Sequence, residues 1–157
     1  NEGCSARDLA DVLADMKAKK LSCKFLDKLV IGCDQIMVCN GQILSKANNP
    51  TNLIEQFRIL RNNSHTLYSA CVVYFANKPE WRFIGSATIT MRNLSDEYIS
   101  KYVDSNWNEV KHCVGGYKIE NSGIAMLSKI NGDYFSILGL PIIQLIDHLV
   151  NRGVLKH

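Results

Sequence analysis

The stretch LVIGCDQIMVCNGQILSK, residues 29–46, decides the fold of this chain. It begins with a short apolar run, residues 29–31, and such a run predicts a buried strand. Asp34 follows where that strand is expected to end. Asn40 and Gly41 then separate the segments IMVC and QILS, and this dipeptide is a strong signal for a two-residue hairpin turn.

The polar residues of this stretch suggest chemistry. An ionised carboxylate is costly to bury without a partner, so Asp34 needs a metal ion, a lysine or a polar cleft. The hairpin is expected to carry Lys46 back toward Asp34. A carboxylate that holds a metal or activates water, beside a lysine, suits reactions of phosphates. The plainer alternative is a structural aspartate near a turn and a solvated lysine, and spacing alone favours it.

The composition is that of a globular domain. The chain has 157 residues, of which 46% are hydrophobic and 21% charged, enough for one domain with a real core. Its net charge of +3 is modest, and no block of like charges predicts binding to nucleic acid or to a membrane. No apolar run approaches the length of a membrane span, and no signal peptide is visible.

The six cysteines are not spaced as a metal site. They form no C-x-x-C pair, and no histidine spacing completes a zinc site. Several lie inside apolar runs and are interpreted as buried free thiols in a reducing compartment, which predicts a cytoplasmic protein. Because the chain starts with Asn1 rather than Met, we expect either that an N-terminal segment, with a first strand, is missing or that the chain was processed.

Four helices are predicted from caps and periodicity. In residues 5–20 Ser5 can cap the helix, and an apolar stripe recurs at helical spacing, formed by Leu9, Val12, Leu13 and Met16. A second helix starts with Asn49 as cap and Pro50 in its first turn, and runs to about residue 61. A third follows Ser95 to about residue 104, with irregular chain to residue 114. The last is expected over residues 141–152.

The remaining segments favour strands. Residues 66–76 and 81–91 are β-prone and read as a hairpin across the turn cluster at residues 77–80. His65, at the start of the first of these strands, is interpreted as a surface or satisfied residue. A further strand is expected within residues 119–130, then a turn at residues 131–133 and a return strand over residues 134–138. Gly115 and Gly116 permit a backbone turn or close approach to a ligand.

Interleaved helices and hairpins predict an α/β (α+β) fold. We expect a central mixed, elongated and twisted sheet with flanking helices. The whole chain, residues 1–157, is expected to be one domain, with a small lobe around residues 93–114.

The final third, GGYKIENSGIAMLSKINGDYFSILGLPI, resembles the C-terminal signature of the Maf family, the septum-formation-inhibitor-like nucleotide pyrophosphatases. That signature has paired small residues before a tyrosine, then Ile-Gln or Ile-Glu, a strand, and a GDY turn into a GLP helix. Earlier segments agree with the family in order and spacing. These are LADVLADMKAKKLS, VIGCDQIMVCNGQILSK, HTLYSACVV and MRNLSDEYISKYV. The match covers essentially the whole chain and implies a fold similar to the Maf and ITPase proteins.

The resemblance implies hydrolysis of nucleoside triphosphates to the monophosphate and pyrophosphate, a house-cleaning activity that depends on a divalent cation, Mg²⁺ or Mn²⁺. Asp34 matches the essential acid, which would bind metal or activate water. Lys17 and Lys46 match lysines that would neutralise phosphate oxygens. Glu120 stands where many members have glutamine, as a substrate-side residue, and Glu2 matches the acid of the DE motif, as a metal ligand.

The Asp34–Gln35 pair carries a further implication. It resembles the branch of the family that acts on modified guanine nucleotides such as 7-methyl-GTP, and makes Gln35 a candidate for substrate binding. The resemblance also makes a homodimer plausible.

Three departures from the family pattern keep alternatives open. Nothing in the chain matches the N-terminal S-x-S-x-x-R motif, Lys46 is flanked by Ser45 and Ala47, and Asn121 replaces a usual glycine. A truncated or degenerate member that binds nucleotide or regulates cell division is the alternative function. An unrelated fold would require both hairpins, at residues 39–44 and 130–135, to be wrong.

Overall fold

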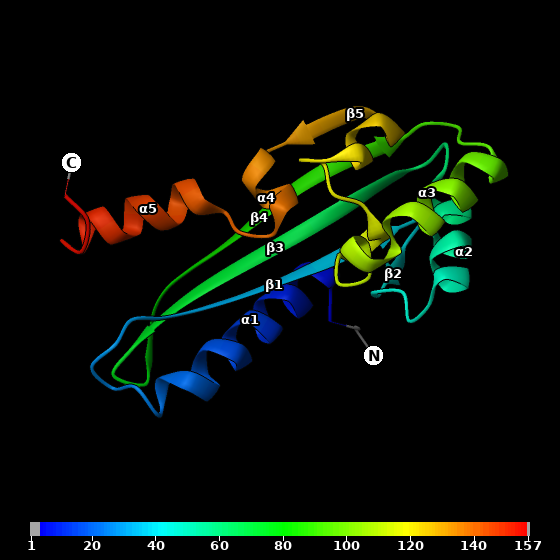
Figure 1. Cartoon of the computed structure of the whole chain (residues 1–157). Helices are drawn as coiled ribbons and strands as arrows, with labels where there is room; N and C mark the ends of the chain where they lie inside the picture. The colour runs from blue at the N-terminus through cyan, green and yellow to red at the C-terminus, as the bar shows by residue number, and fades with distance from the viewer. Residues whose placement is uncertain (1–3, 157) are drawn as a thin grey trace. The chain divides into compact units, whose positions relative to one another are not determined.

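The computed structural model describes residues 4–156 and confirms an α/β fold with a five-stranded sheet and helices (Figure 1). The strand order is β2-β1-β3-β4-β5. The chain divides into two compact units. Among the described residues, unit 1 contains residues 4–35, 68–86 and 133–156, and unit 2 contains residues 36–67 and 87–132.

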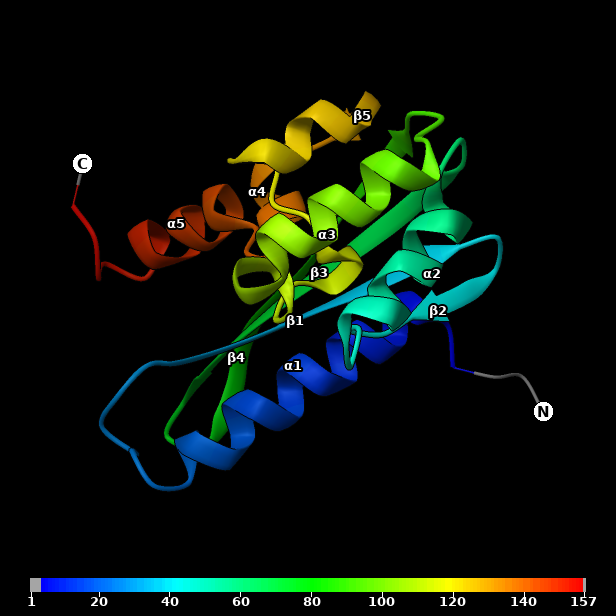
Figure 2. The same cartoon turned by 45° about the vertical axis from the view of Figure 1, so that its right-hand side comes forward.

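In unit 1 helix α1 (Ala6–Ser22) lies along strand β1 (Val30–Cys39), as Figures 1 and 2 both show. Ser5 caps α1 as expected, because its hydroxyl accepts a hydrogen bond from the Asp8 amide at 3.1 Å. Strands β3 (Ser64–Phe75) and β4 (Lys78–Met91) form the expected hairpin, and their residues 68–75 and 78–86 belong to this unit. The turn lies at Ala76 and Asn77, both in the left-handed region.

The face that α1 buries differs from the one predicted. Val12 and Met16 of the apolar stripe are exposed, and the helix instead packs through four small residues, Ala10, Ala14, Ala18 and Ser22. Gly32 of β1 explains this choice. A Cβ at Gly32 would lie 2.3 Å from the Ala14 carbonyl oxygen, so helix and strand backbones approach more closely than larger side chains allow.

Strand β1 is also longer than predicted. It runs unbroken through Gly32, so Asp34 lies in the middle of a ten-residue strand and not at the end of a short one. The hairpin that follows is confirmed, since Cys39 pairs with Gln42 of strand β2 (Gln42–Leu44). Asn40 and Gly41 have φ of 50° and 76°, the positive values that a type I′ turn requires.

Two C-terminal helices complete unit 1. Helix α5 (Ile142–Asn151) follows Pro141 as expected, and its His148 stacks on Trp81 of β4 with ring centroids 5.1 Å apart. Beyond the helix, Arg152 donates to both carboxylate oxygens of Glu80, at 2.7 and 3.1 Å. The core of this part is formed by Cys71, Val73 and Leu145 with Leu29, Cys33, Trp81, Leu140 and Leu149 packed against them.

The return strand expected over residues 134–138 is wrong, because these residues form helix α4 (Tyr134–Leu138). Asp133 caps this helix through a hydrogen bond from the Ser136 amide at 2.8 Å, and Gly139 ends it at φ 99°. Asn131 and Gly132 therefore end a strand and Asp133 caps a helix, where a hairpin turn was predicted.

Unit 2 contains β2 and helices α2 (Pro50–Leu60) and α3 (Asp96–Val110), which lie side by side (Figure 2). Phe57 of α2 meets Tyr102 of α3 edge to face, with centroids 5.6 Å apart. Asn49 and Ser95 cap the two helices as predicted. Helix α3 continues to Val110 through residues expected to be irregular.

The rest of unit 2 lies beyond α3. Two short 3₁₀ helices, Val114–Gly116 and Ser122–Met126, lead into strand β5 (Leu127–Gly132). This strand is shorter than predicted, and it pairs antiparallel with β4, with Ile89 opposite Ile130. No helix among residues 4–156 is both long enough and apolar enough to cross a membrane.

Candidate functional site

Asp34 is paired with Lys17. The Lys17 ammonium, one turn before the end of α1, forms an ion pair with Asp34 and also donates to the Cys33 carbonyl oxygen at 3.0 Å. The Asp34 side chain is 16% exposed, whereas that of Lys17 is 58% exposed. The Asp34 carboxylate is therefore largely shielded from solvent, whereas the Lys17 side chain is exposed enough for an anion to reach it.

Gln35 points away from Asp34. Successive side chains of a strand alternate between its two faces, and here Asp34 faces α1 while Gln35 faces β3 and α4. The Gln35 side-chain nitrogen donates to the Ser69 hydroxyl at 2.9 Å and approaches the carbonyl oxygens of Ser136 and Ile137, both at 3.0 Å. These contacts direct the Gln35 side-chain nitrogen toward β3 and α4.

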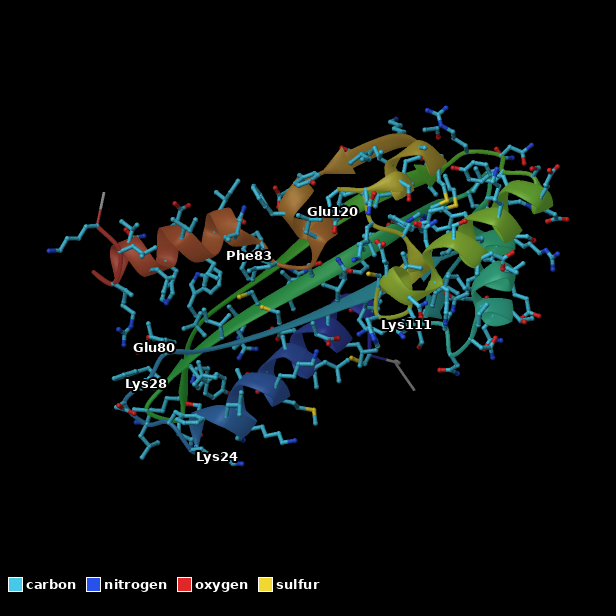
Figure 3. The ribbon with its side chains drawn as sticks, in the orientation of Figure 1. Lys24, Lys28, Glu80, Phe83, Lys111 and Glu120 are labelled. Atoms are coloured by element: carbon cyan, nitrogen blue, oxygen red, sulfur yellow. The ribbon has the colours of Figure 1, made fainter. Side chains whose placement is uncertain are left out.

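Lys46 and Glu120 both belong to unit 2. Both side chains act on one thiol: burial raises the pKa of Cys113, Lys118 and Lys46 lower it, and Glu120 raises it. Lys46 and Glu120 are exposed (Glu120 is labelled in Figure 3), and Gln56 of α2 holds the loop before Lys46 by donating to the Ser45 carbonyl at 2.8 Å. Lys46 belongs to a different unit from Asp34, and Lys17 is the lysine that pairs with this acid.

The Gly115–Gly116–Tyr117 segment makes the tight turn that its sequence permits. Both glycines have positive φ, 78° and 66°, and a Cβ on them would collide with Met37 and Leu53 respectively. Tyr117 then anchors the segment, because its hydroxyl lies 2.6 Å from the Nε2 atom of His65.

His65 is a core residue, 1% exposed, so of the two predicted alternatives the surface position is wrong, whereas its Nε2 atom has the partner that a satisfied residue needs. Its Nδ1 atom is buried without a hydrogen-bond partner, and burial lowers the pKa of His65 to about 4. The spacing of β3 held the signal: His65, Leu67, Ser69 and Cys71 alternate along one face and are all buried.

The described residues contain no ready-made cluster of metal ligands. Glu2 lies outside residues 4–156, and within that range no group of three His, Cys, Asp or Glu residues could hold an ion. The six cysteines are free thiols, of which Cys39 and Cys71 are buried and Cys4 and Cys23 exposed.

Comparisons with known proteins agree with the resemblance. The family described as Maf-like protein matches residues 2–152. A nucleoside triphosphate pyrophosphatase of Ruegeria sp. (strain TM1040) is 41% identical over 99% of this chain and 78% of its own length. One of Roseobacter denitrificans is 44% identical over 97% and 76%, and a 7-methyl-GTP pyrophosphatase of Rhizobium meliloti is 37% identical over 98% and 77%.

Proposed function

The chain belongs to the family of Maf-like proteins, and from this membership we propose that it hydrolyses nucleoside triphosphates to the monophosphate and pyrophosphate. The observation that carries the proposal is the Lys17–Asp34 pair, which places a cation and a carboxylate side by side on α1 and β1. The names of the three relatives support the reaction. The presence of Asp34, Lys17 and Lys46 supports an enzyme over the alternative of a degenerate regulatory protein.

The reaction requires a nucleophile and charge neutralisation. Water attacks the α-phosphorus, the bond from this phosphorus to the bridging oxygen breaks, and its electron pair leaves with pyrophosphate. Lys17 is exposed enough to turn from Asp34 toward a phosphate oxygen, where its charge stabilises the transition state. Asp34, once released, can accept the proton of the attacking water or hold a metal ion. Lys46 and Glu120 remain predicted substrate-binding residues on the basis of the resemblance.

A divalent metal ion fits this donor set when it arrives with the nucleotide. Mg²⁺ is commonly held by one or two carboxylates together with substrate phosphates, and Asp34 is one such carboxylate. When bound, the ion neutralises charge on the phosphate oxygens. We therefore expect Mn²⁺ alone to bind weakly, and to bind tightly in the presence of a non-hydrolysable α,β-methylene nucleotide, as measured by calorimetry. Tight binding of Mn²⁺ without nucleotide would contradict this.

The first test is release of pyrophosphate. The chain should turn over nucleoside triphosphates with Mg²⁺ or Mn²⁺, and the panel includes 7-methyl-GTP because of the Asp34–Gln35 pair and the Rhizobium relative. Absence of pyrophosphate release from every nucleotide would overturn the proposed function.

The second test is the Asp34→Asn variant. It keeps the side-chain shape but removes the charge, the proton acceptor and the ligand for metal, so turnover should be lost with the fold intact. Asp27→Asn, in the exposed loop before β1, is the matched control and should leave turnover unchanged. Wild-type turnover in Asp34→Asn would contradict the assignment of Asp34 as the catalytic residue.

We further propose that the enzyme acts in the cytoplasm, where free thiols persist, and that it serves to remove modified or non-standard nucleotides. A homodimer remains a prediction of the resemblance.

A further inference from the structure

We propose that Gln35 is a positioning residue that clamps strand β1 beside Asp34, and that it contacts no part of the nucleotide. This inference rests on the proposed function and replaces the sequence-based prediction of Gln35 as a substrate-binding residue. It is carried by a network of hydrogen bonds from β1 to β3 and α4, all inside unit 1.

The orientation of the Gln35 amide is determined by its neighbours. Its nitrogen faces two carbonyl oxygens, those of Ser136 and Ile137, at 3.0 Å each. Rotating the amide by half a turn would place its oxygen against these two acceptors. The third neighbour, the Ser69 hydroxyl, donates its own hydrogen to the Ser136 carbonyl at 2.6 Å and can therefore accept from Gln35.

The same contacts leave the Gln35 nitrogen with nothing to offer a ligand. A primary amide has two hydrogens, and three acceptors within 3.0 Å compete for them. The partners are themselves fixed: Ser69 and Ser136 are 0% and 1% exposed, and Ser136 donates from its amide and hydroxyl to Asp133 at 2.8 and 2.9 Å.

The fold makes room for this network. A Cβ at Gly85 of β4 would lie 2.1 Å from the Ser136 hydroxyl, so only glycine lets α4 approach the strands this closely. Hydrogen bonds joined in one network reinforce one another, so this set favours one arrangement of its members.

Asp34 is held between two contacts on opposite faces of the strand. Lys17 binds its carboxylate and the Cys33 carbonyl on the α1 face, and Gln35, the next residue, fixes the backbone from the α4 face. The oxygen of Gln35 also lies on that second face, 4.0 Å from the position of a Cβ on Gly139, whereas the Asp34 carboxylate faces α1. Misplacing a reacting group by about 1 Å can cost on the order of 100-fold in rate.

The test is a cycle of Gln35→Met, Ser69→Ala and the double variant. We expect kcat to fall by roughly 10- to 100-fold in each single variant, as for a misplaced catalytic group. The fall should be by the same factor for every nucleotide, with KM within about twofold of wild type, and the double variant should lose little more. Ser86→Ala, at an exposed serine of the same unit, should behave as wild type.

A loss confined to one nucleobase, or a rise in KM with kcat unchanged, would show that Gln35 contacts the substrate and would overturn the proposal. Full additivity of the two single losses would also overturn it, because members of one network are coupled.

A second measurement does not depend on turnover. The side-chain amide protons of Gln35 should exchange slowly with solvent in the NMR spectrum of the wild type, and faster in Ser69→Ala. Rapid exchange in the wild type would contradict the clamp. An inactive wild type with slow exchange would overturn the proposed function while leaving the clamp supported.

Discussion

His65 connects a single buried side chain to the stability of the fold. Its pKa is lowered from 6.5 to about 4 by burial, so the unfolded chain takes up a proton at a pH where the folded chain does not. The stability that this histidine contributes is therefore complete above pH 6.5 and is lost as pH falls toward 4. At 1.36 kcal/mol for each pKa unit, the loss amounts to about 3 kcal/mol.

The His65→Gln variant tests this at the residue scale. Glutamine can still hydrogen bond to Tyr117 but has no titrating group, so its unfolding free energy should fall less between pH 7 and pH 4 than that of the wild type. Urea denaturation at the two pH values measures the difference, with the exposed His112→Gln variant as control. Equal pH dependence in His65→Gln and the wild type would show that His65 does not resist protonation.

At the scale of elements, the contact of α1 with β1 depends on the absence of side chains. In Gly32→Ala the new Cβ would meet backbone atoms of α1, the Ala14 oxygen at 2.3 Å and the Ala18 nitrogen at 2.6 Å. Overpacking of this kind typically costs about 1–3 kcal/mol. Denaturant unfolding should show that loss, while Val12→Ala, at a side chain 48% exposed, should stay within about 0.5 kcal/mol. A Gly32→Ala variant as stable as the wild type would contradict this packing.

The same elements explain what sequence patterns could predict. Caps formed by Ser5, Asn49 and Ser95 and the Asn40–Gly41 turn depend on local chemistry, and all were predicted correctly. The buried face of α1 was not, because a stripe of alanines is inconspicuous next to larger apolar residues. Its role depends on Gly32, which is distant in sequence.

The predictions for helix α4 and strand β1 were wrong for related reasons. Residues 134–138 are β-prone, and the features that favour a helix lie at its two ends, the capping bond from the Ser136 amide to Asp133 and the left-handed Gly139. Gly32 looked like the end of a strand, although it is needed for close packing inside one.

At the scale of the whole molecule, the cysteines differ in exposure and should therefore differ in reactivity. Cys4 and Cys23 are exposed, and Cys39 and Cys71 are 1% and 0% exposed. Burial raises the pKa of Cys39. The pKa of Cys71 is raised mainly by its hydrogen bond with Cys33 and, to a smaller extent, by burial. Both thiols therefore resist forming a thiolate. Titration with a thiol reagent should label Cys4 and Cys23 first, and all six cysteines only after unfolding.

The contradicting outcome of that titration is prompt labelling of Cys39 or Cys71 in the native protein, which mass mapping would reveal. A Cys23→Ser variant is the control, and it should remove one fast thiol without changing the slow ones.

The candidate site was predicted in part. The resemblance named Lys17 and Asp34, and the structure brings this pair together. Spacing alone favoured a structural aspartate near a turn, and the only lysine that the hairpin was expected to bring toward it was Lys46. Sequence spacing near a hairpin favours residues close in the chain, but α1 returns over β1 and brings Lys17 across a separation of 17 residues.

Because Lys17 is paired with Asp34, an anion that binds Lys17 must replace the carboxylate as its partner. An anion that takes the ammonium leaves the carboxylate without its counter-charge, so inorganic phosphate gains little by binding there. A polyphosphate that arrives with its own cation returns a positive charge to the carboxylate as it removes one. We therefore expect an anion that brings no cation to bind this pair more weakly than it would bind an unpaired lysine.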